Sequence, residues 1–232
     1  KVAILDADLT GPSIPKTFGL SGKARMKDHL IEPINSNTGI SVISINLMLD
    51  HESEPVIWRG PLLGKIVKQF WSEVLWEEID FMFIDMPPGT GDAQLSLAQS
   101  LPLSGGVIVT LPQMVSVEDA ARGLAMFNEL NVPILGVIEN MSYLEMPDGT
   151  RMEVFGRGGG EMLAQNEGVP FLGTIPMDPA VRKGGDDGKP VIVSQPQSAP
   201  ARALRSLAEQ LAARLSVNAY QNQPAVTINV VG

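Results

Sequence analysis

Two aspartates one residue apart, Asp6 and Asp8, end the first apolar run of the sequence, and Asp85 ends a later run, Phe81 to Ile84. Alternate residues of a strand point to opposite sides, so one carboxylate of the pair can support the loop while the other faces a ligand. An apolar run that ends in Asp has the form of a Walker B strand, whose carboxylate holds a magnesium ion beside phosphates, usually through water. The three aspartates therefore predict a magnesium and phosphate site, although Asp is also ordinary in turns and helix caps.

The loop after Asp85 reads Met86-Pro87-Pro88-Gly89-Thr90-Gly91-Asp92. A loop of this composition could change its conformation with the presence of a γ-phosphate. A strand end followed by a simple Pro/Gly turn is the alternative. The whole Asp-x-Pro-Pro-Gly-Thr-Gly-Asp pattern is much rarer than an apolar run ending in Asp, and we therefore favour the functional interpretation.

Two later loops contain residues that suit a nucleobase. Asn140 follows the apolar run Ile134 to Ile138, and its amide both donates and accepts hydrogen bonds, as the edge of adenine requires. A turn asparagine is the alternative. Two prolines, Pro176 and Pro179, fix the loop after the run Phe171 to Ile175, and that loop could form one wall of a base pocket.

Short apolar runs alternate with helical patterns along the chain, which predicts an α/β fold with a doubly wound, mostly parallel sheet. We expect strands at 2–5, 40–45, 81–84, 106–110, 134–138 and 171–175, an edge strand at 191–193, and helices around 62–70, 117–130 and 204–215. One domain would cover residues 1–215, followed by a tail of unassigned role at 216–232. Ligands bind such sheets at the carboxyl ends of the strands, where the candidate residues lie.

Composition excludes several classes of protein. The net charge of -9 argues against a nucleic-acid binder. The sequence contains no run of 18 apolar residues, so no membrane span is predicted. The chain has no cysteine, which excludes disulfides, zinc–thiolate sites and a thiol-ligated iron–sulfur cluster made from its own residues. The glycine-rich stretch at 156–161 lacks the Lys-Ser/Thr ending of a phosphate loop, and no complete Walker A sequence is present.

Six ordered segments over roughly residues 1–193 together resemble the Mrp (ApbC-like) branch of the MinD/ParA group of P-loop ATPases. They are Leu5–Pro15, Trp58–Pro61, Asp85–Asp92, Glu139–Tyr143, Phe155–Glu161 and Gly173–Pro179. The resemblance implies a P-loop NTPase fold and an ATP-binding and ATP-hydrolysing protein of the cytoplasm. It further implies a homodimer that acts with client apoproteins in iron–sulfur cluster assembly or transfer, without nucleic acid or membrane.

The resemblance also implies roles for single residues. Asp8 would position the attacking water, with Asp6 in support, and Asp85 would hold Mg²⁺ through water. Gly89 and Gly91 would belong to the switch II loop at the phosphates. Two further residues, Pro176 and Asp178, would complete an adenine pocket around Asn140.

The chain departs from the family pattern in two places. The deviant Walker A loop of the family would lie upstream of Lys1, together with a central strand beside the Walker B strand, so we expect the sequence to be part of a longer protein. Many relatives carry Cys-Pro-x-Cys where this chain has Met146-Pro147-Asp148-Gly149. These departures keep open a non-catalytic adaptor or dimerisation scaffold of the same fold. A positioning ATPase of the MinD or ParA kind is a further alternative.

Overall fold

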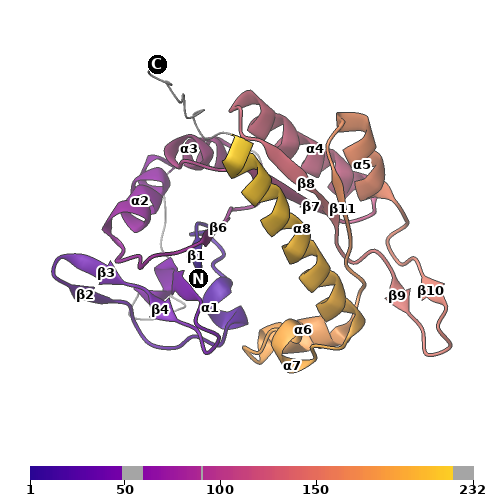
Figure 1. Ribbon diagram of the computed structural model, residues 1–232, viewed down its shortest axis with the longest axis horizontal. Coiled ribbons are helices and arrows are strands. Elements are labelled where there is room, and N and C mark those ends of the chain that lie inside the picture. Colours follow the sequence, from indigo (N-terminus) through magenta and orange to yellow (C-terminus); the bar gives the residue numbers. More distant parts are fainter. Residues whose placement is uncertain (49–59, 90, 222–232) are drawn as a thin grey trace, which may run out of the picture.

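A computed structural model describes residues 1–48, 60–89 and 91–221 (Figure 1). The candidate residues lie on two sheets. The first has the order β4-β5-β1-β6, in which β5, β1 and β6 are parallel and β4 is antiparallel. These strands are β1 (Val2–Asp6), β4 (Ile34–Asn35), β5 (Ser41–Ile43) and β6 (Phe81–Asp85).

The second sheet is wholly parallel and has the order β11-β8-β7. Its strands are β7 (Gly106–Thr110), β8 (Ile134–Glu139) and β11 (Phe171–Thr174). The predicted strands at 2–5, 81–84, 106–110, 134–138 and 171–175 are therefore present, and the α/β prediction with a mostly parallel sheet is confirmed.

Helices connect the parallel strands. They are α1 (Ile14–Thr17), η1 (Ile45–Leu47), α2 (Gly60–Glu73), α3 (Asp92–Ser100), α4 (Met114–Glu129), α5 (Gly159–Glu167), α6 (Pro179–Asp186), α7 (Val191–Ser194) and α8 (Ala199–Gln221). Two hairpins project from this framework (Figure 1). One is made by β2 (Arg25–Lys27) and β3 (Leu30–Glu32), the other by β9 (Leu144–Glu145) and β10 (Arg151–Met152).

Alternate residues of each strand pack into separate cores, as the two-residue period of a strand requires. In the first sheet, Leu5 packs with α2 and α3, whereas its neighbour Ile4 packs with α1. In the second, Val137 packs with α4 and α5, whereas Ile138 packs with Leu207 of α8. Both sheets are thus covered by helices on two faces, which explains why their strands are apolar throughout.

In the described part of the chain, β6 and β7 each end their sheet, as β4 and β11 do at the opposite edges. Strands β6 and β7 each carry an apolar side chain in an exposed position, Phe83 at 48% and Val109 at 56% of its full accessible area. Helix α3 links these two strands, and Figure 1 shows the sheets lying on either side of the molecule. Strands β6 and β7 are therefore not paired with each other in the described residues, and the two sheets are separated between them.

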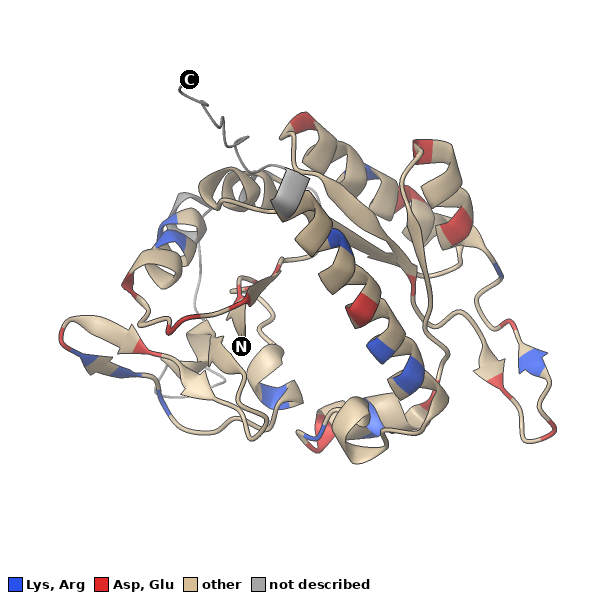
Figure 2. Ribbon diagram, in the orientation of Figure 1, with Lys and Arg blue, Asp and Glu red and all other residues tan. Residues whose placement is uncertain are grey.

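Helix α8, which the sequence predicts around 204–215, packs against the second sheet. Leu207 is buried against the second sheet, and the side-chain amide of Gln210 donates to the carbonyl of Leu172 at 3.1 Å. The arginines of α8 are exposed and lie along its length in Figure 2. Among the described helices, none is long and apolar enough to cross a membrane.

Two sequence-based expectations differ from the structure. The expected edge strand at 191–193 is wrong, because these residues form α7: the Pro190 carbonyl accepts the N–H groups of Val193 and Ser194 at 2.8 and 3.0 Å. The β-branched residues suggested a strand, but a single helical turn satisfies their backbone locally. Helix α8 runs from Ala199 to Gln221 and is thus longer than the helix expected around 204–215; residues 222–232 lie outside the described residues.

Two glycines, Gly188 and Gly19, are in close contact where the loop after α6 meets the loop after α1. Gly188, after α6, has a φ of +67°, and a Cβ there would lie 2.3 Å from the Cα of Gly19, after α1. Gly168 has a similar φ of +65° with nothing within 4 Å of its Cβ position. We expect Gly188→Ala to lower the free energy of unfolding by about 2–3 kcal/mol and the control Gly168→Ala by about 1 kcal/mol, measured by urea unfolding. Equal losses would show that the close approach is not needed.

Candidate functional site

Three aspartates meet at the carboxyl ends of β1 and β6. Asp6 and Asp85 are directly opposed in the parallel register of these strands. The Ala7 N–H donates to the carbonyl oxygen of Asp85 at 2.9 Å, so Asp8 leaves β1 from the same edge. The structure therefore brings together the three carboxylates that the sequence predicts for one site.

Asp6 is the buried member of this cluster, with none of its surface exposed. The Ser44 hydroxyl donates to its Oδ2 at 2.9 Å, whereas Oδ1 has no hydrogen-bond partner among the described residues. Burial, and then the negative charges of Asp85 and Asp8, raise the pKa of Asp6 to about 6. Partial burial, and then the charge of Asp8, also raise the pKa of Asp85. The three carboxylates thus form a negatively charged cluster that a cation would stabilise.

Asp8 is held by the loop that follows it. Its Oδ1 accepts the Thr10 hydroxyl at 2.7 Å and the N–H groups of Thr10 and Gly11 at 3.2 and 3.0 Å. A Cβ at Gly11 would lie 3.3 Å from Oδ2 of Asp8, so a larger residue there would crowd the second oxygen. The loop thus fixes the carboxylate through one oxygen and leaves Oδ2 for other contacts.

These residues fit a magnesium ion held mainly through water. Hard carboxylate oxygens are what Mg²⁺ prefers, and the unpartnered Oδ1 of Asp6 marks a place where positive charge is missing. Among the described residues, however, no group of three or more His, Cys, Asp or Glu side chains could hold a metal ion. A magnesium ion here would need water or phosphate oxygens for most of its ligands.

The loop after β6 turns sharply before α3. Gly89 has a φ of +93°, which a side chain would strain, and Gly91 is the N-cap residue of α3. Gln94 is buried, and its side-chain amide donates to the carbonyl of Pro88, which ties the loop to the helix. This role of Gln94 could not be predicted, because a polar helix residue is usually exposed.

Asn140 lies at the end of β8, on the second sheet. Its N–H donates to the carbonyl of Thr110 at 2.8 Å, and its side-chain oxygen accepts the N–H of Met141 at 2.9 Å. Met141 adopts a left-handed conformation, with a φ of +52°, which is unusual for a residue with a long side chain. With respect to the residues that the structure describes, the amide nitrogen of Asn140 and the second lone pair of its oxygen remain as groups that suit a base edge.

The loop after β11 lies beside Asn140, because Ile175 N–H donates to the carbonyl of Glu139 at 2.8 Å. Pro176 is buried in this loop. Asp178 is the N-cap residue of α6, where its Oδ1 accepts the N–H of Ala180 at 2.7 Å. Asp178 thus has a structural function in this loop, and its contact with a base stays a prediction. The structure places this group and the aspartate cluster on separate sheets.

The glycine-rich stretch forms the start of α5, and an internal carboxylate already occupies it. The Gly160 N–H donates to Oε2 of Glu139 at 2.9 Å. A Cβ at Gly159 would lie 2.2 Å from the carbonyl oxygen of Pro112, so the backbone packs directly on the loop after β7. The glycines therefore serve close packing. No role is predicted for Glu139, whose one signal in the sequence is a carboxylate at the end of an otherwise apolar strand.

The segment Met146–Gly149, where many Mrp-like proteins carry their cysteines, is the turn of the β9–β10 hairpin. Asp148 Oδ1 accepts the N–H of Thr150 at 2.9 Å and its hydroxyl at 2.6 Å, which lowers the pKa of Asp148. The guanidinium of Arg151 lies 4.1 Å from the ring centroid of Tyr143. Hydrogen bonds and a cation–π contact hold this hairpin, and it offers no thiolate.

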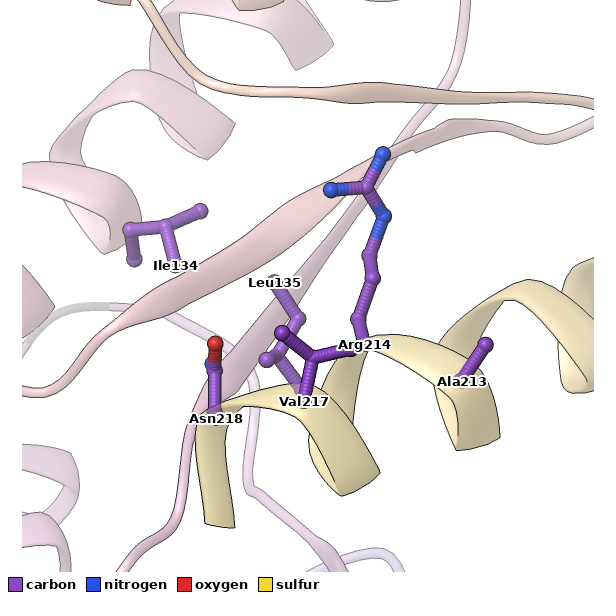
Figure 3. A pocket seen from close by; sticks show the side chains of 6 residues that line it. All are labelled: Ile134, Leu135, Ala213, Arg214, Val217 and Asn218. Carbon is purple, nitrogen blue, oxygen red and sulfur yellow. The ribbon is translucent and has the colours of Figure 1, made fainter. Parts of the chain in front are cut away.

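A pocket of about 330 Å³ lies between the start of β8 and the last turns of α8 (Figure 3). It is lined by Ile134, Leu135, Ala213, Arg214, Val217 and Asn218. Because Ile134 begins β8, the pocket lies at the opposite end of this strand from Asn140. It is therefore separate from the candidate site.

The high pKa of Asp6 predicts how stability changes with pH. The folded protein binds a proton at Asp6 more tightly than the unfolded chain, whose Asp pKa is 3.8, so stability falls as pH rises from about 4 to about 6. The loss reaches about 3 kcal/mol, from about 1.4 kcal/mol per pKa unit. Asp6→Asn, which stays neutral, should remove most of this slope. Urea unfolding in EDTA from about pH 4 to about pH 6.5 measures it.

Asp148→Asn is the matched control for this experiment. Its carboxylate is exposed and its pKa is lowered, so its contribution to stability is lost only as pH falls below the ordinary Asp range. This variant should keep the wild-type slope between about pH 4 and about pH 6.5. Equal slopes for the wild-type protein and Asp6→Asn would contradict the assignment of the raised pKa to Asp6.

Comparison with known proteins decides the family. A family profile described as ParA, NUBPL iron-transfer P-loop NTPase, matches residues 1–212. The chain belongs to this family of P-loop NTPases. Proteins named iron–sulfur cluster carrier protein are 47% identical over 94% of the chain in Synechocystis and 41% identical over 92% of the chain in Pyrococcus furiosus. The resemblance to the Mrp branch is thereby confirmed.

The chain spans 63% of the Synechocystis protein and 76% of the Pyrococcus furiosus protein. Among solved structures, the nucleotide-binding protein from Archaeoglobus fulgidus in complex with ADP is 36% identical, with a TM-score of 0.73 over 86% of this chain and 77% of that one. The cell division ATPase MinD from Pyrococcus furiosus has a TM-score of 0.64 over 91% of this chain and 85% of that one. At 21% identity, MinD shows the shared P-loop ATPase fold alone.

Proposed function

We propose that the full-length protein binds and hydrolyses ATP with magnesium and acts in the assembly or transfer of iron–sulfur clusters. The observation that carries this proposal is the cluster of Asp6, Asp8 and Asp85 on the paired edges of β1 and β6. Membership of the P-loop NTPase family and the ADP complex of the Archaeoglobus fulgidus relative support the nucleotide. The names of the relatives support the link to iron–sulfur clusters.

Each of the three aspartates would have its own function. Asp85 would hold Mg²⁺ through water, and the ion when bound would supply positive charge to the phosphate oxygens. Asp8, fixed through Oδ1 by its loop, would orient the attacking water through Oδ2. Asp6 would support Asp8 from within the sheet. Gly89 and Gly91 would allow the loop after β6 to approach the phosphates.

The second sheet would hold the base. Asn140 would contact adenine, and Pro176 would form a wall of the pocket with Asp178 at its rim. The phosphate loop would come from upstream of Lys1, on a strand between β6 and β7. The open edges of these strands, with Phe83 and Val109 exposed, support that placement.

The iron–sulfur cluster would be cargo, bound by thiols that this chain does not supply. Cluster ligands in proteins are mainly cysteine thiolates, and this chain has none. The turn Met146–Gly149 does not fit a cluster, since a thioether cannot replace a thiolate as an ordinary ligand. We propose that client apoproteins or another segment of the full-length protein supply the thiols, and that the protein works as a cytoplasmic homodimer.

The absence of cysteine also favours a second candidate, a non-catalytic adaptor with the same fold. The two candidates differ in the residues just upstream of Lys1. A Gly-Lys-Gly-Gly-x-Gly-Lys-Ser/Thr sequence there would favour the ATPase, and its absence the adaptor.

Two assays on the full-length protein test the proposed function. Phosphate release from ATP, with magnesium and with EDTA, tests the ATPase, and we expect hydrolysis only with magnesium. Anaerobic reconstitution with iron and sulfide tests the cargo assignment, and we expect no cluster absorption band unless an upstream segment supplies thiols. Absent hydrolysis would refute the ATPase, hydrolysis that persists in EDTA would refute the role of magnesium, and an iron–sulfur cluster in a thiol-free full-length protein would refute the cargo assignment.

A further inference from the structure

We propose that Glu139 is a positioning residue for adenine recognition: its buried carboxylate joins the end of β8 to the start of α5 and so fixes Asn140 in place. The inference rests on the proposed function, because it assigns adenine to Asn140. It adds a residue that contacts no nucleotide itself and acts through the loop that does.

Glu139 is 1% exposed, yet both of its carboxylate oxygens are used. The Ser142 hydroxyl donates to Oε1 at 2.5 Å, and the Gly160 N–H donates to Oε2 at 2.9 Å. A carboxylate without such donors would be costly to bury. The second donor belongs to the first turn of α5, where the helix dipole also favours a negative charge. The two contacts thus join three segments, namely β8, the loop after it, and α5.

The backbone of the same loop is fixed on both sides of Asn140. Asn140 N–H donates to Thr110 of β7 at 2.8 Å, and Ser142 N–H donates to the carbonyl of Ile175 at 3.0 Å. Between them, Met141 holds its left-handed φ of +52°, which costs roughly 1–2 kcal/mol for a residue with a Cβ. The loop keeps this strained geometry only while its anchors hold. The Glu139–Ser142 bond is the side-chain anchor on the strained residue's far side.

The glycines at the start of α5 are what allow the carboxylate to reach the helix. A Cβ at Gly160 would lie 3.0 Å from the Cβ of Glu139, which is tighter than ordinary contact. Gly158, the N-cap residue, has a φ of +72° that turns the chain into the helix. The glycine-rich segment and the Glu139–Tyr143 segment are therefore two halves of one contact. This gives the glycines a purpose other than phosphate binding.

Binding of two probes to the full-length protein separates positioning of the base from general damage. ADP reports on base and phosphates, whereas inorganic tripolyphosphate reports on the phosphate side alone. Glu139→Ala removes both hydrogen bonds and should weaken ADP binding about tenfold, whereas tripolyphosphate binding should stay within about twofold of wild type. Glu139→Gln can still accept from Gly160 and meet Ser142, so it should restore most of the ADP affinity.

Two further variants complete the design. Ser142→Ala loses one bond and should weaken ADP binding about threefold, which keeps the test available if Glu139→Ala does not fold. Glu161→Gln removes an exposed charge from the same helix turn and should change neither probe. Unchanged ADP binding by folded Glu139→Ala or Ser142→Ala, or an equal loss for both probes, would overturn the role of Glu139. Wild-type protein that binds neither probe would overturn the proposed function itself.

Discussion

Asp85→Asn in the full-length protein is expected to lower kcat/KM for magnesium-dependent ATP hydrolysis by about 1000-fold. The asparagine has nearly the same shape, but it removes the negative charge that would hold the magnesium shell at the end of β6. The buried Asp6 opposite would then face a neutral amide, so the fold should remain intact. Steady-state phosphate release with varied ATP and magnesium measures the effect.

Asp80→Asn is the matched control, because Asp80 is an exposed carboxylate just before the other end of the same strand. It should hydrolyse ATP at the wild-type rate. If Asp85→Asn kept activity within about tenfold of wild type, the Walker B assignment would be wrong.

Asp8→Ala is expected to lower kcat by about 1000-fold while the Kd for ATP changes by about threefold or less. A group that orients the attacking water acts mainly in the transition state, so its loss slows turnover more than it weakens binding. The structure supports this role because three donors fix one oxygen of Asp8 and leave the other available. Single-turnover hydrolysis and equilibrium binding of ATP, measured on the same preparation, separate the two effects.

Thr10→Ala provides a graded comparison, since it removes one of the donors to Asp8 and leaves the carboxylate. Its kcat should fall by about threefold. If Asp8→Ala weakened ATP binding as strongly as it slowed turnover, Asp8 would be a binding residue and not a water-positioning one.

Much of the fold could be predicted because its strands are covered on both faces. Ile134 to Ile138 is apolar throughout, and such a run indicates a buried parallel strand without further context. Val191 to Val193 has the same composition but forms a helical turn, because Pro190 supplies the accepting carbonyl. Single-residue preference cannot distinguish these two cases, since the choice depends on which neighbours complete the backbone hydrogen bonds.

The candidate site could be predicted where the type of a residue and its position at the end of an apolar run are enough to indicate its function. Asp6 and Asp85 each end an apolar run, Asp8 follows Asp6 by two residues, and the rule for parallel sheets places such residues at a common edge. Glu139 and Gln94 could not be identified in this way. Both are buried polar residues whose importance depends on donors and acceptors distant in sequence, such as Gly160, and these contacts exist only in the folded chain.

The contact between Glu139 and Gly160 changes how the glycine-rich segment at 156–161 is interpreted. By composition it suggests a phosphate loop, yet in the structure its N–H group serves the carboxylate of Glu139. The lack of cysteine, by contrast, does not depend on contacts in the folded chain. It is visible in the sequence at once, and the β9–β10 hairpin shows how the turn is held without thiols.

Calorimetric titration of ATP into the full-length protein, with magnesium and with EDTA, tests one claim above the others. That claim is that Asp6, Asp8 and Asp85 form the magnesium side of an ATP site. We expect magnesium to tighten ATP binding at least about tenfold in the wild-type protein and Asp85→Asn to lose this gain. Equal ATP affinity with and without magnesium in the wild-type protein, or a full magnesium gain in Asp85→Asn, would contradict it.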